Sequence, residues 1–474
     1  MFIIDYQKIK EKLYNSTKKI EILFRISLAI LTAILIYYFY YINDLENHYQ
    51  CDFSGYYAAA KLINEGEDPY INRAEFNDDR KFEHSQYLQN PIVIQFFRIF
   101  GTFNYHQAKT FWFIIESLLI VGIIGLLIRR TTNLIITYGL LLITLPILFW
   151  PLYSHFERGQ TDVVVLFFIV ISYLLWCRGR SAIAGITLAL GCVFKIPAFF
   201  IFSVPLIKGD KKFLIGGGVF LLFLLVFSVI INGDEINKKY FFDYLPTIGA
   251  TGNLPSEVYN RNIYNKLDVS ANLNTPYYFD GMIYETVSLK LNISTGSFSR
   301  FSNRLIAGIG WKVGIFGFLI SFMSIFIFLH HRDSIISKDL AWAFAMVATL
   351  LFHPMTHVMN YVWIIFIFKL IISVIIRGNK HINNYTIRAL YILLFVAFLI
   401  IGMSDGVKNQ LISLIDFLLN GLIPSFDIDK LHYLLNYWMQ ERIWIGGLII
   451  YFTLLFMMKY FHHIFPSDNE NKMI

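Results

Sequence analysis

The chain has 474 residues, of which 56% are hydrophobic, 18% aromatic and 15% charged. A soluble domain carries roughly 25% charged residues, so this composition argues against a soluble protein. The net charge of +7 does not indicate nucleic-acid binding, because the Lys and Arg residues lie in short clusters between apolar runs. The sequence therefore predicts an all-α polytopic membrane protein.

A membrane-crossing helix needs roughly 20 apolar residues. The first such run, Ile22–Ile42, follows a basic start and lacks a small-residue cleavage site, so we interpret it as a retained anchor. Nine further spans are predicted, at Thr110–Ile128, Asn133–Leu152, Asp162–Trp176, Phe213–Ile231, Leu305–Leu329, Leu340–Phe352, Val358–Ile376, Ile387–Gly402 and Arg442–Tyr460. We thus expect about ten crossings within a transmembrane domain of residues 22–461. Residues 1–21 and the tail 462–474 are expected to be cytoplasmic.

The stretch Ser181–Ile207 differs from the other apolar runs. Basic residues flank both of its ends, which predicts that both ends lie inside, and the run is interrupted around Lys195 and Pro197. A hairpin of two half-helices satisfies both facts, since non-helical backbone at that depth must be buried in protein or line a cavity. The outer loops are then 43–109, 153–161, 232–304, 353–357 and 403–441. Residues 43–90 hold ten acidic residues and four basic ones, as the positive-inside rule favours for an outer loop.

A short helix is predicted in the first outer loop. Ser54 is a plausible N-cap, Tyr56 lies on an apolar helical stripe, and Gly66 with Asp68-Pro69 ends the helix. We expect an amphipathic helix along the outer interface, with Asp52 immediately before it. The Asp52 carboxylate could take a proton from an acceptor hydroxyl, or it could merely cap the helix.

The residues of this loop carry a resemblance. Asp-Phe-x-x-Tyr-Tyr-x-Ala-Ala at residues 52–60, followed by Gly-x-Asp-Pro-Tyr at 66–70, resembles the first-loop signature of glycosyltransferase family 87. Three more pieces match in order: Asn90-Pro91 leading to Ala108 and Trp112, Gly159-Gln160-Thr-Asp162, and Ala184-Gly185 through Lys195-Ile-Pro197. Asp162 stands where the family usually has Asn. His353-Pro-Met-Thr-His357 replaces the family's usual His pair.

The resemblance implies a helical bundle of the GT-C superfamily and an inverting sugar transfer. The donor would be a polyprenyl-phosphate sugar, expected to be mannose, and the acceptor a glycolipid or glycan on the outer side of the plasma membrane. Asp52 would deprotonate the acceptor hydroxyl, and cations would neutralise the departing phosphate. The resemblance implies no metal and no other cofactor.

The basic candidates for binding the donor phosphate are Lys195 and Arg158. A Lys at an apolar break costs roughly 2.5–3.5 kcal/mol on insertion scales, so Lys195 should contact phosphate or form an internal salt bridge. Arg158, at an outer helix end, could reach the phosphate or extend to lipid headgroups.

The remaining candidates would contact the sugar or the acceptor: Tyr56, Tyr57, Gln160, Asp162, His353 and His357. The two histidines, four residues apart, could instead bind a metal, but Pro354 disrupts the helix that would align them. Ordinary interfacial histidines are the third interpretation.

A lipid-linked sugar flippase or transporter is the alternative class, because transporters also use broken helices with a charged residue at the break. Another GT-C transferase is a further alternative. The Asp52 motif discriminates between these classes, since a transporter does not need a lone outer carboxylate beside an interfacial helix.

Overall fold

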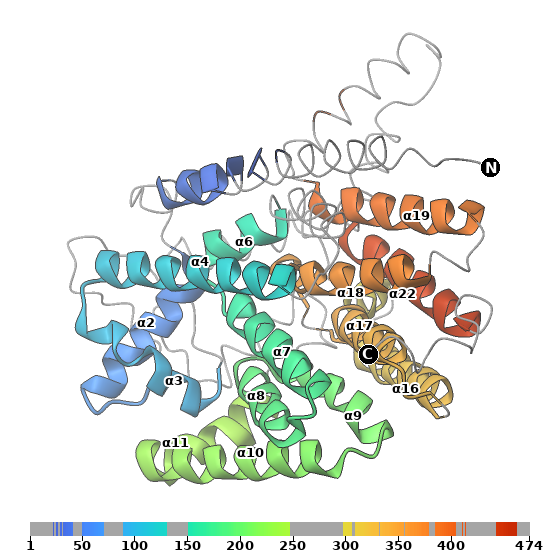
Figure 1. The fold of residues 1–474 in the computed structure, drawn as a ribbon. Helices are drawn as coiled ribbons and strands as arrows, with labels where there is room; N and C mark the ends of the chain where they lie inside the picture. The colour runs from blue at the N-terminus through green and yellow to red at the C-terminus, as the bar shows by residue number, and fades with distance from the viewer. Residues whose placement is uncertain are drawn as a thin grey trace, which may run out of the picture.

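The computed structural model describes residues 50–70, 89–129, 150–246, 297–305, 309–330, 332–354, 356–378, 384–403 and 442–461, together with parts of 22–40 and positions 410 and 413. All regular secondary structure in these residues is helical (Figure 1). The predictions for residues 1–21 and 462–474 lie outside the described residues. So does most of the predicted span Asn133–Leu152, whereas the structure describes the greater part of the predicted span Ile22–Ile42 as helix.

The first group of helices comprises α2 (Cys51–Asn64), α3 (Pro91–Phe97), η1 (Phe100–Thr102), α4 (Tyr105–Arg129) and α6 (Trp150–Arg158). α3 begins where the sequence suggests, since the Asn90 side chain accepts a hydrogen bond from the Ile92 N–H and Pro91 occupies the first turn. α2 packs against α3, η1, α4 and α6. It is thereby held inside the protein.

The broken segment predicted at Ser181–Ile207 is present. α7 (Asp162–Cys177) leads into α8 (Ser181–Phe194), which stops at Lys195 and is followed by η2 (Ile196–Phe202) and α9 (Ser203–Ile207). Pro197 lies in the first turn of η2, where its missing N–H is tolerated. The Ser181 hydroxyl donates to Asp210 at 2.7 Å, so the two ends of the segment meet, as a hairpin requires.

α10 (Lys211–Asn232) starts at the end of the hairpin where Ser181 meets Asp210, and it runs along one edge of the molecule to α11 (Asp234–Lys238) and η3 (Lys239–Tyr244) (Figure 1). The Asp210 side chain caps its start by accepting from the Phe213 N–H. At its far end, the Asn232 amide donates to the Pro91 carbonyl and accepts from Gln95. α10 therefore connects the hairpin ends to the side of the molecule that carries α2 and α3.

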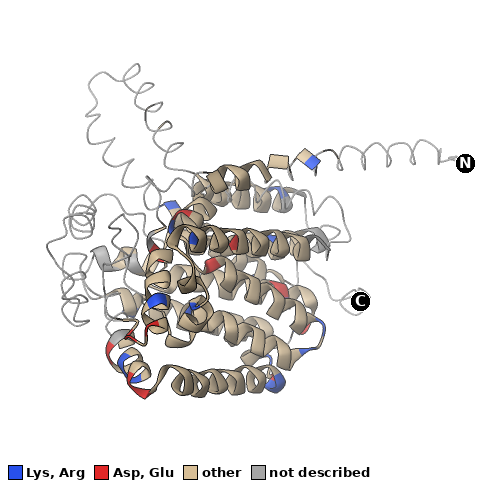
Figure 2. Ribbon diagram, turned by 90° about the vertical axis from the view of Figure 1, so that its left-hand side faces the viewer, with Lys and Arg blue, Asp and Glu red and all other residues tan. Residues whose placement is uncertain are grey.

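The remaining described helices are α15 (Phe298–Leu305), α16 (Gly310–Leu329), α17 (Ile335–Phe352), η4 (Val358–Trp363), α18 (Ile364–Gly378), α19 (Asn384–Gly402) and α22 (Arg442–Lys459). α17 packs against α16, α18 and α22, and every residue from Val358 to Ile375 is buried. Among the described residues, the charged residues lie mainly near helix ends (Figure 2).

The expected ten crossings are not confirmed. Six described helices are long and apolar enough to cross a membrane, at Tyr105–Leu127, Lys211–Asn232, Gly310–Leu329, Ile335–Phe352, Val358–Ile375 and Arg442–Lys459. α6 and α7 would add one more as a broken span, but they meet at an angle of 119°. α7 and the stretch Arg388–Gly402 are apolar but shorter, and a full crossing needs roughly 20 residues. The chain is a multi-pass membrane protein with at least these apolar helices.

Candidate active site

Asp52 lies inside α2 rather than ahead of it. The helix begins at Cys51 with Gln50 as its N-cap, so the expectation that Ser54 caps the helix is wrong. A carboxylate in the first turn is favoured by the helix dipole. The expected amphipathic surface helix is also wrong, because both faces of α2 from Phe53 to Ala60 are buried by helices distant in sequence.

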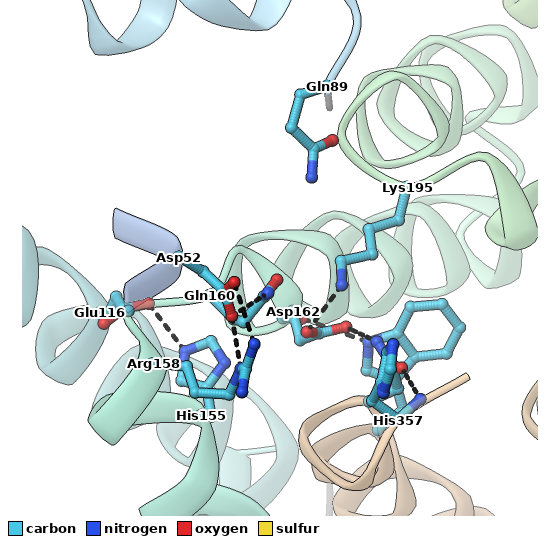
Figure 3. Close-up of polar contacts among 12 residues, drawn as sticks. Asp52, Gln89, Glu116, His155, Arg158, Gln160, Asp162, Lys195 and His357 are labelled. Atoms are coloured by element: carbon cyan, nitrogen blue, oxygen red, sulfur yellow. Dashed lines mark hydrogen bonds and ion pairs between the residues drawn. The ribbon is translucent and has the colours of Figure 1, made fainter. Parts of the chain in front are cut away.

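The Asp52 carboxylate is held by two residues from the end of α6 and the following turn. Arg158 contacts it through two nitrogens, with Nε 2.5 Å from Oδ2 and a terminal nitrogen 3.1 Å from Oδ1. Gln160 Nε2 donates to Oδ2 at 2.6 Å. The Asp52 side chain keeps 15% of its surface exposed and that of Arg158 keeps 43%. Arg158, predicted to bind phosphate, therefore pairs with the predicted base (Figure 3).

Gly159 makes this arrangement possible. It has φ of +67°, and a Cβ at this position would lie 2.5 Å from the Cβ of Phe53. Only glycine permits both the left-handed turn and this close approach. The turn after α6 is thereby pressed against α2, with Arg158 and Gln160 on either side of Gly159.

Tyr56 extends the hydrogen-bonded cluster. Its hydroxyl donates to Gln160 Oε1 at 3.3 Å, and Gln89 Nε2 lies 3.5 Å from the same hydroxyl. Burial raises the pKa of Tyr56 well above its usual value, and the charges of Asp52 and Asp162 raise it further. Tyr56 therefore stays protonated and lies near both carboxylates.

Tyr57 belongs to a different environment. Its hydroxyl donates to the Phe103 carbonyl at 2.8 Å, and its ring packs edge-on against Tyr105. Of the two neighbouring tyrosines, the structure brings Tyr56 to the polar cluster and places Tyr57 in the aromatic core.

A second ion pair lies beside the first. Lys195, at the break between α8 and η2, places its Nζ 3.1 Å from Asp162 Oδ2. The Asp162 carboxylate is fully buried, whereas 17% of the Lys195 side chain is exposed. The Asn360 side chain donates to the other Asp162 oxygen, and the Trp363 indole donates to the Asp162 carbonyl. Of the two predicted roles for Lys195, the structure contains the internal salt bridge.

The two histidines flank the turn between α17 and η4. His353 packs against Trp311, and burial lowers its pKa to about 3, with a smaller contribution from the positive charge of Lys195. The His357 backbone N–H donates to Asn360 Oδ1 at 2.6 Å. Within the described residues, no group of three or more potential metal ligands lies together.

Sequence reasoning missed a buried pair next to this site. His155 Nε2 lies 2.7 Å from Glu116 Oε1, and neither side chain has any exposed surface. The signal was available, because Glu116 is an acidic residue within an apolar span and such residues are functional candidates by default. Gln89 and Asn360 were also missed, and no pattern around either residue could have identified them.

The site thus has two carboxylate–cation pairs that converge from α2, α6, α7 and the hairpin break (Figure 3). Asp52 can accept a proton on an oxygen with a free lone pair, and the two cations can attract an anionic group. This combination suits a displacement in which a hydroxyl loses a proton and a phosphate departs.

Comparison with known proteins identifies the family. The sequence profile of glycosyltransferase family 87 matches residues 87–363, more than half of the chain. This range includes Arg158, Gln160, Asp162, Lys195 and both histidines, and it begins after Asp52. No curated protein and no solved structure matches the chain. The chain belongs to glycosyltransferase family 87 and is a glycosyltransferase.

Proposed function

We propose that this chain is an inverting glycosyltransferase that moves a sugar, for which we propose mannose, from a polyprenyl-phosphate donor to a glycolipid or glycan acceptor. The observation that carries the proposal is the placement of Asp52 against Arg158 and Gln160, directly beside the Lys195–Asp162 pair. A general base and two cations thereby lie within one small region, which is what this transfer requires. The active site would face the outer side of the plasma membrane.

In this reaction the acceptor hydroxyl gives its proton to Asp52 while its oxygen attacks the anomeric carbon of the donor. A new bond forms between that oxygen and the anomeric carbon. The bond between the anomeric carbon and the phosphate oxygen breaks, and its electron pair stays with the phosphate. Attack opposite to the departing phosphate inverts the configuration, so a β-linked donor gives an α-linked product. Polyprenyl phosphate leaves with one more negative charge, which Arg158 and Lys195 would neutralise.

Membership of the glycosyltransferase family supports a transferase over the flippase or transporter alternative. The break at Lys195, which suggested transport, has a structural explanation here because Lys195 is the counter-ion of buried Asp162. Sugar or acceptor contacts are proposed for Tyr56, whose hydroxyl donates to Gln160 beside Asp52, and for His353, which lies within reach of the positive charge of Lys195.

The decisive experiment is Asp52→Asn in purified protein supplied with polyprenyl-phosphate mannose and a membrane glycolipid extract as acceptor. Asn keeps the size of the side chain and one acceptor oxygen for Arg158 and Gln160. Loss of a general base typically costs roughly 10²–10⁴ in rate, so transfer should fall by that factor with the fold intact. Asp333→Asn makes the same chemical change at a 73% exposed side chain in the loop before α17 and serves as the matched control. An Asp52→Asn enzyme with the wild-type rate would rule out Asp52 as the base.

A further inference from the structure

The two partners of Asp52 differ in how firmly they are held. Arg158 contributes two contacts but keeps 43% of its side chain exposed, at the end of α6. Gln160 contributes one contact and is only 9% exposed. Flexible, exposed side chains reorganise at little cost, while buried polar ones are fixed by their hydrogen bonds.

Gln160 is fixed from its other side. Because its amide nitrogen donates to Asp52, its amide oxygen must face Tyr56, and the Tyr56 hydroxyl donates to that oxygen at 3.3 Å. Tyr56 is itself buried and stacks on Phe97. A buried line of hydrogen bonds thus runs from α2 through Gln160 to Asp52 without involving Arg158.

Arg158 nevertheless limits what Asp52 can do. While it pairs with both carboxylate oxygens, Oδ2 accepts from two donors and Oδ1 from one, and the carboxylate charge is neutralised. An Arg guanidinium also binds phosphate through two parallel hydrogen bonds. During the proposed transfer Asp52 loses its negative charge as it takes the proton, and the departing phosphate gains one.

We infer that Arg158 passes from Asp52 to the donor phosphate when the donor binds and that Gln160 is the positioning residue that holds Asp52 throughout. This inference rests on the proposed function. It implies that the donor phosphate and Asp52 compete for one guanidinium, so donor binding unmasks the base and precedes productive binding of the acceptor. Asp52 and the phosphate are then thermodynamically coupled through Arg158.

The coupling can be measured by binding alone. The probe is a short-chain prenyl phosphate, titrated into the detergent-solubilised full-length protein by calorimetry. Asp52→Asn, which removes the competing charge, should bind the probe roughly tenfold more tightly than wild type, within the usual range of couplings. In an Arg158→Gln background the same Asp52→Asn change should have no effect on affinity. The corresponding prenyl alcohol, which lacks the phosphate, should not distinguish the variants.

The positioning role of Gln160 is tested by measuring kcat and the donor KM of variants separately. Gln160→Leu should lower kcat while leaving the donor KM unchanged, whereas Arg158→Lys should mainly raise the donor KM. Tyr56→Phe removes the hydroxyl that anchors Gln160 and that Gln89 also contacts, and it should lower kcat by a smaller factor. A Gln160 with a merely structural role would lower the yield of folded protein while leaving kcat per folded molecule unchanged, which would overturn its assignment.

The outcomes separate the inference from the proposed function. Equal affinity of wild type and Asp52→Asn for the prenyl phosphate would overturn the exchange of Arg158, even if Asp52→Asn abolishes transfer. A wild-type protein that neither binds the prenyl phosphate nor transfers sugar from a polyprenyl phosphate would overturn both. Tighter binding by Asp52→Asn that disappears in the Arg158→Gln background supports the exchange.

Discussion

The Lys195 ammonium lies 3.1 Å from an Asp162 carboxylate that has no exposed surface. The two residues belong to different helical segments, and their pairing brings the hairpin break to the start of α7. Removing one partner of a buried pair leaves an uncompensated charge, which typically costs about 3–5 kcal/mol. The pair therefore has a role in stability in addition to any role with phosphate.

Lys195→Met should accordingly destabilise the protein by about 3–5 kcal/mol, measured by thermal unfolding in detergent. The double variant Lys195→Met with Asp162→Asn should recover most of this stability, because Asn removes the buried charge and keeps the shape. If Lys195 also contacts the donor phosphate, the stable double variant will still use donor poorly. A double variant as unstable as Lys195→Met would contradict the ion-pair explanation.

Gly159→Ala should disturb both the fold and the site. The left-handed conformation costs a non-glycine residue about 1–2 kcal/mol. The added Cβ would also press on Phe53 of α2. The clash with Phe53 should push α2 away from α6. The contacts of Asp52 with Arg158 and Gln160 should then be lost, and activity should fall. The measurements are the melting temperature and the transfer rate.

Gly179→Ala is the matched control. Gly179 also has a left-handed backbone, with φ of +74°, but a Cβ there would meet nothing within 4 Å. It should lower stability by about 1–2 kcal/mol and leave the transfer rate per folded molecule unchanged. Equal effects of the two substitutions on the rate would show that the contact with Phe53 does not matter.

His353 should make stability depend on pH. Its pKa is about 3 in the folded protein, against an ordinary value of 6.5 in the unfolded chain. Above pH 6.5 the residue is neutral in both states. Between pH 6.5 and 3 the unfolded chain binds more protons, so acidification destabilises the fold by up to about 1.4 kcal/mol per pH unit.

His353→Gln should flatten this part of the pH profile of the melting temperature. Trp311→Phe alters the packing around His353 without removing the titrating group, so it should shift the profile and keep its slope. A His353→Gln variant with the wild-type slope would assign the acid sensitivity to other residues.

The proposed topology can be tested by labelling. Lys238 and Asp333 are 64% and 73% exposed and lie at opposite ends of the helices that follow the hairpin. With the native cysteines replaced, Lys238→Cys should react with a membrane-impermeant maleimide in intact cells, and Asp333→Cys only after permeabilisation. The reverse pattern, in which Asp333→Cys reacts in intact cells and Lys238→Cys only after permeabilisation, would show that the hairpin crosses the membrane and inverts the later loops.

Local features of this fold could be predicted from the sequence, and long-range contacts could not. The break near Lys195 was predictable because Pro197 limits the helix locally. The partner of Asp52 was not, since Arg158 lies 106 residues away and reaches it only through the packing of α6 on α2. The same reason explains the error over α2, whose alternating apolar and small residues suggest one buried face, whereas distant helices cover both.

Charges within apolar runs were the most informative sequence feature. Lys195 was identified in this way, and the same criterion applied to Glu116 would have led to its buried contact with His155. The partner of each charged residue could not be predicted, because it depends on which helices pack together in the fold.

The complete burial of Val358–Ile375 has a practical consequence for engineering this protein. This segment, η4 followed by most of α18, is surrounded by other helices, whereas only 11% of the apolar stretch of α10 is buried. Hydropathy is similar in the two segments, at 2.2 and 2.9, so sequence alone would treat them as equivalent targets for polar redesign. Water-solubilising substitutions belong on the outward face of α10, for example at Leu222 or Ile230. The same changes in α18 would introduce polar atoms into close-packed protein and unfold the centre of the bundle.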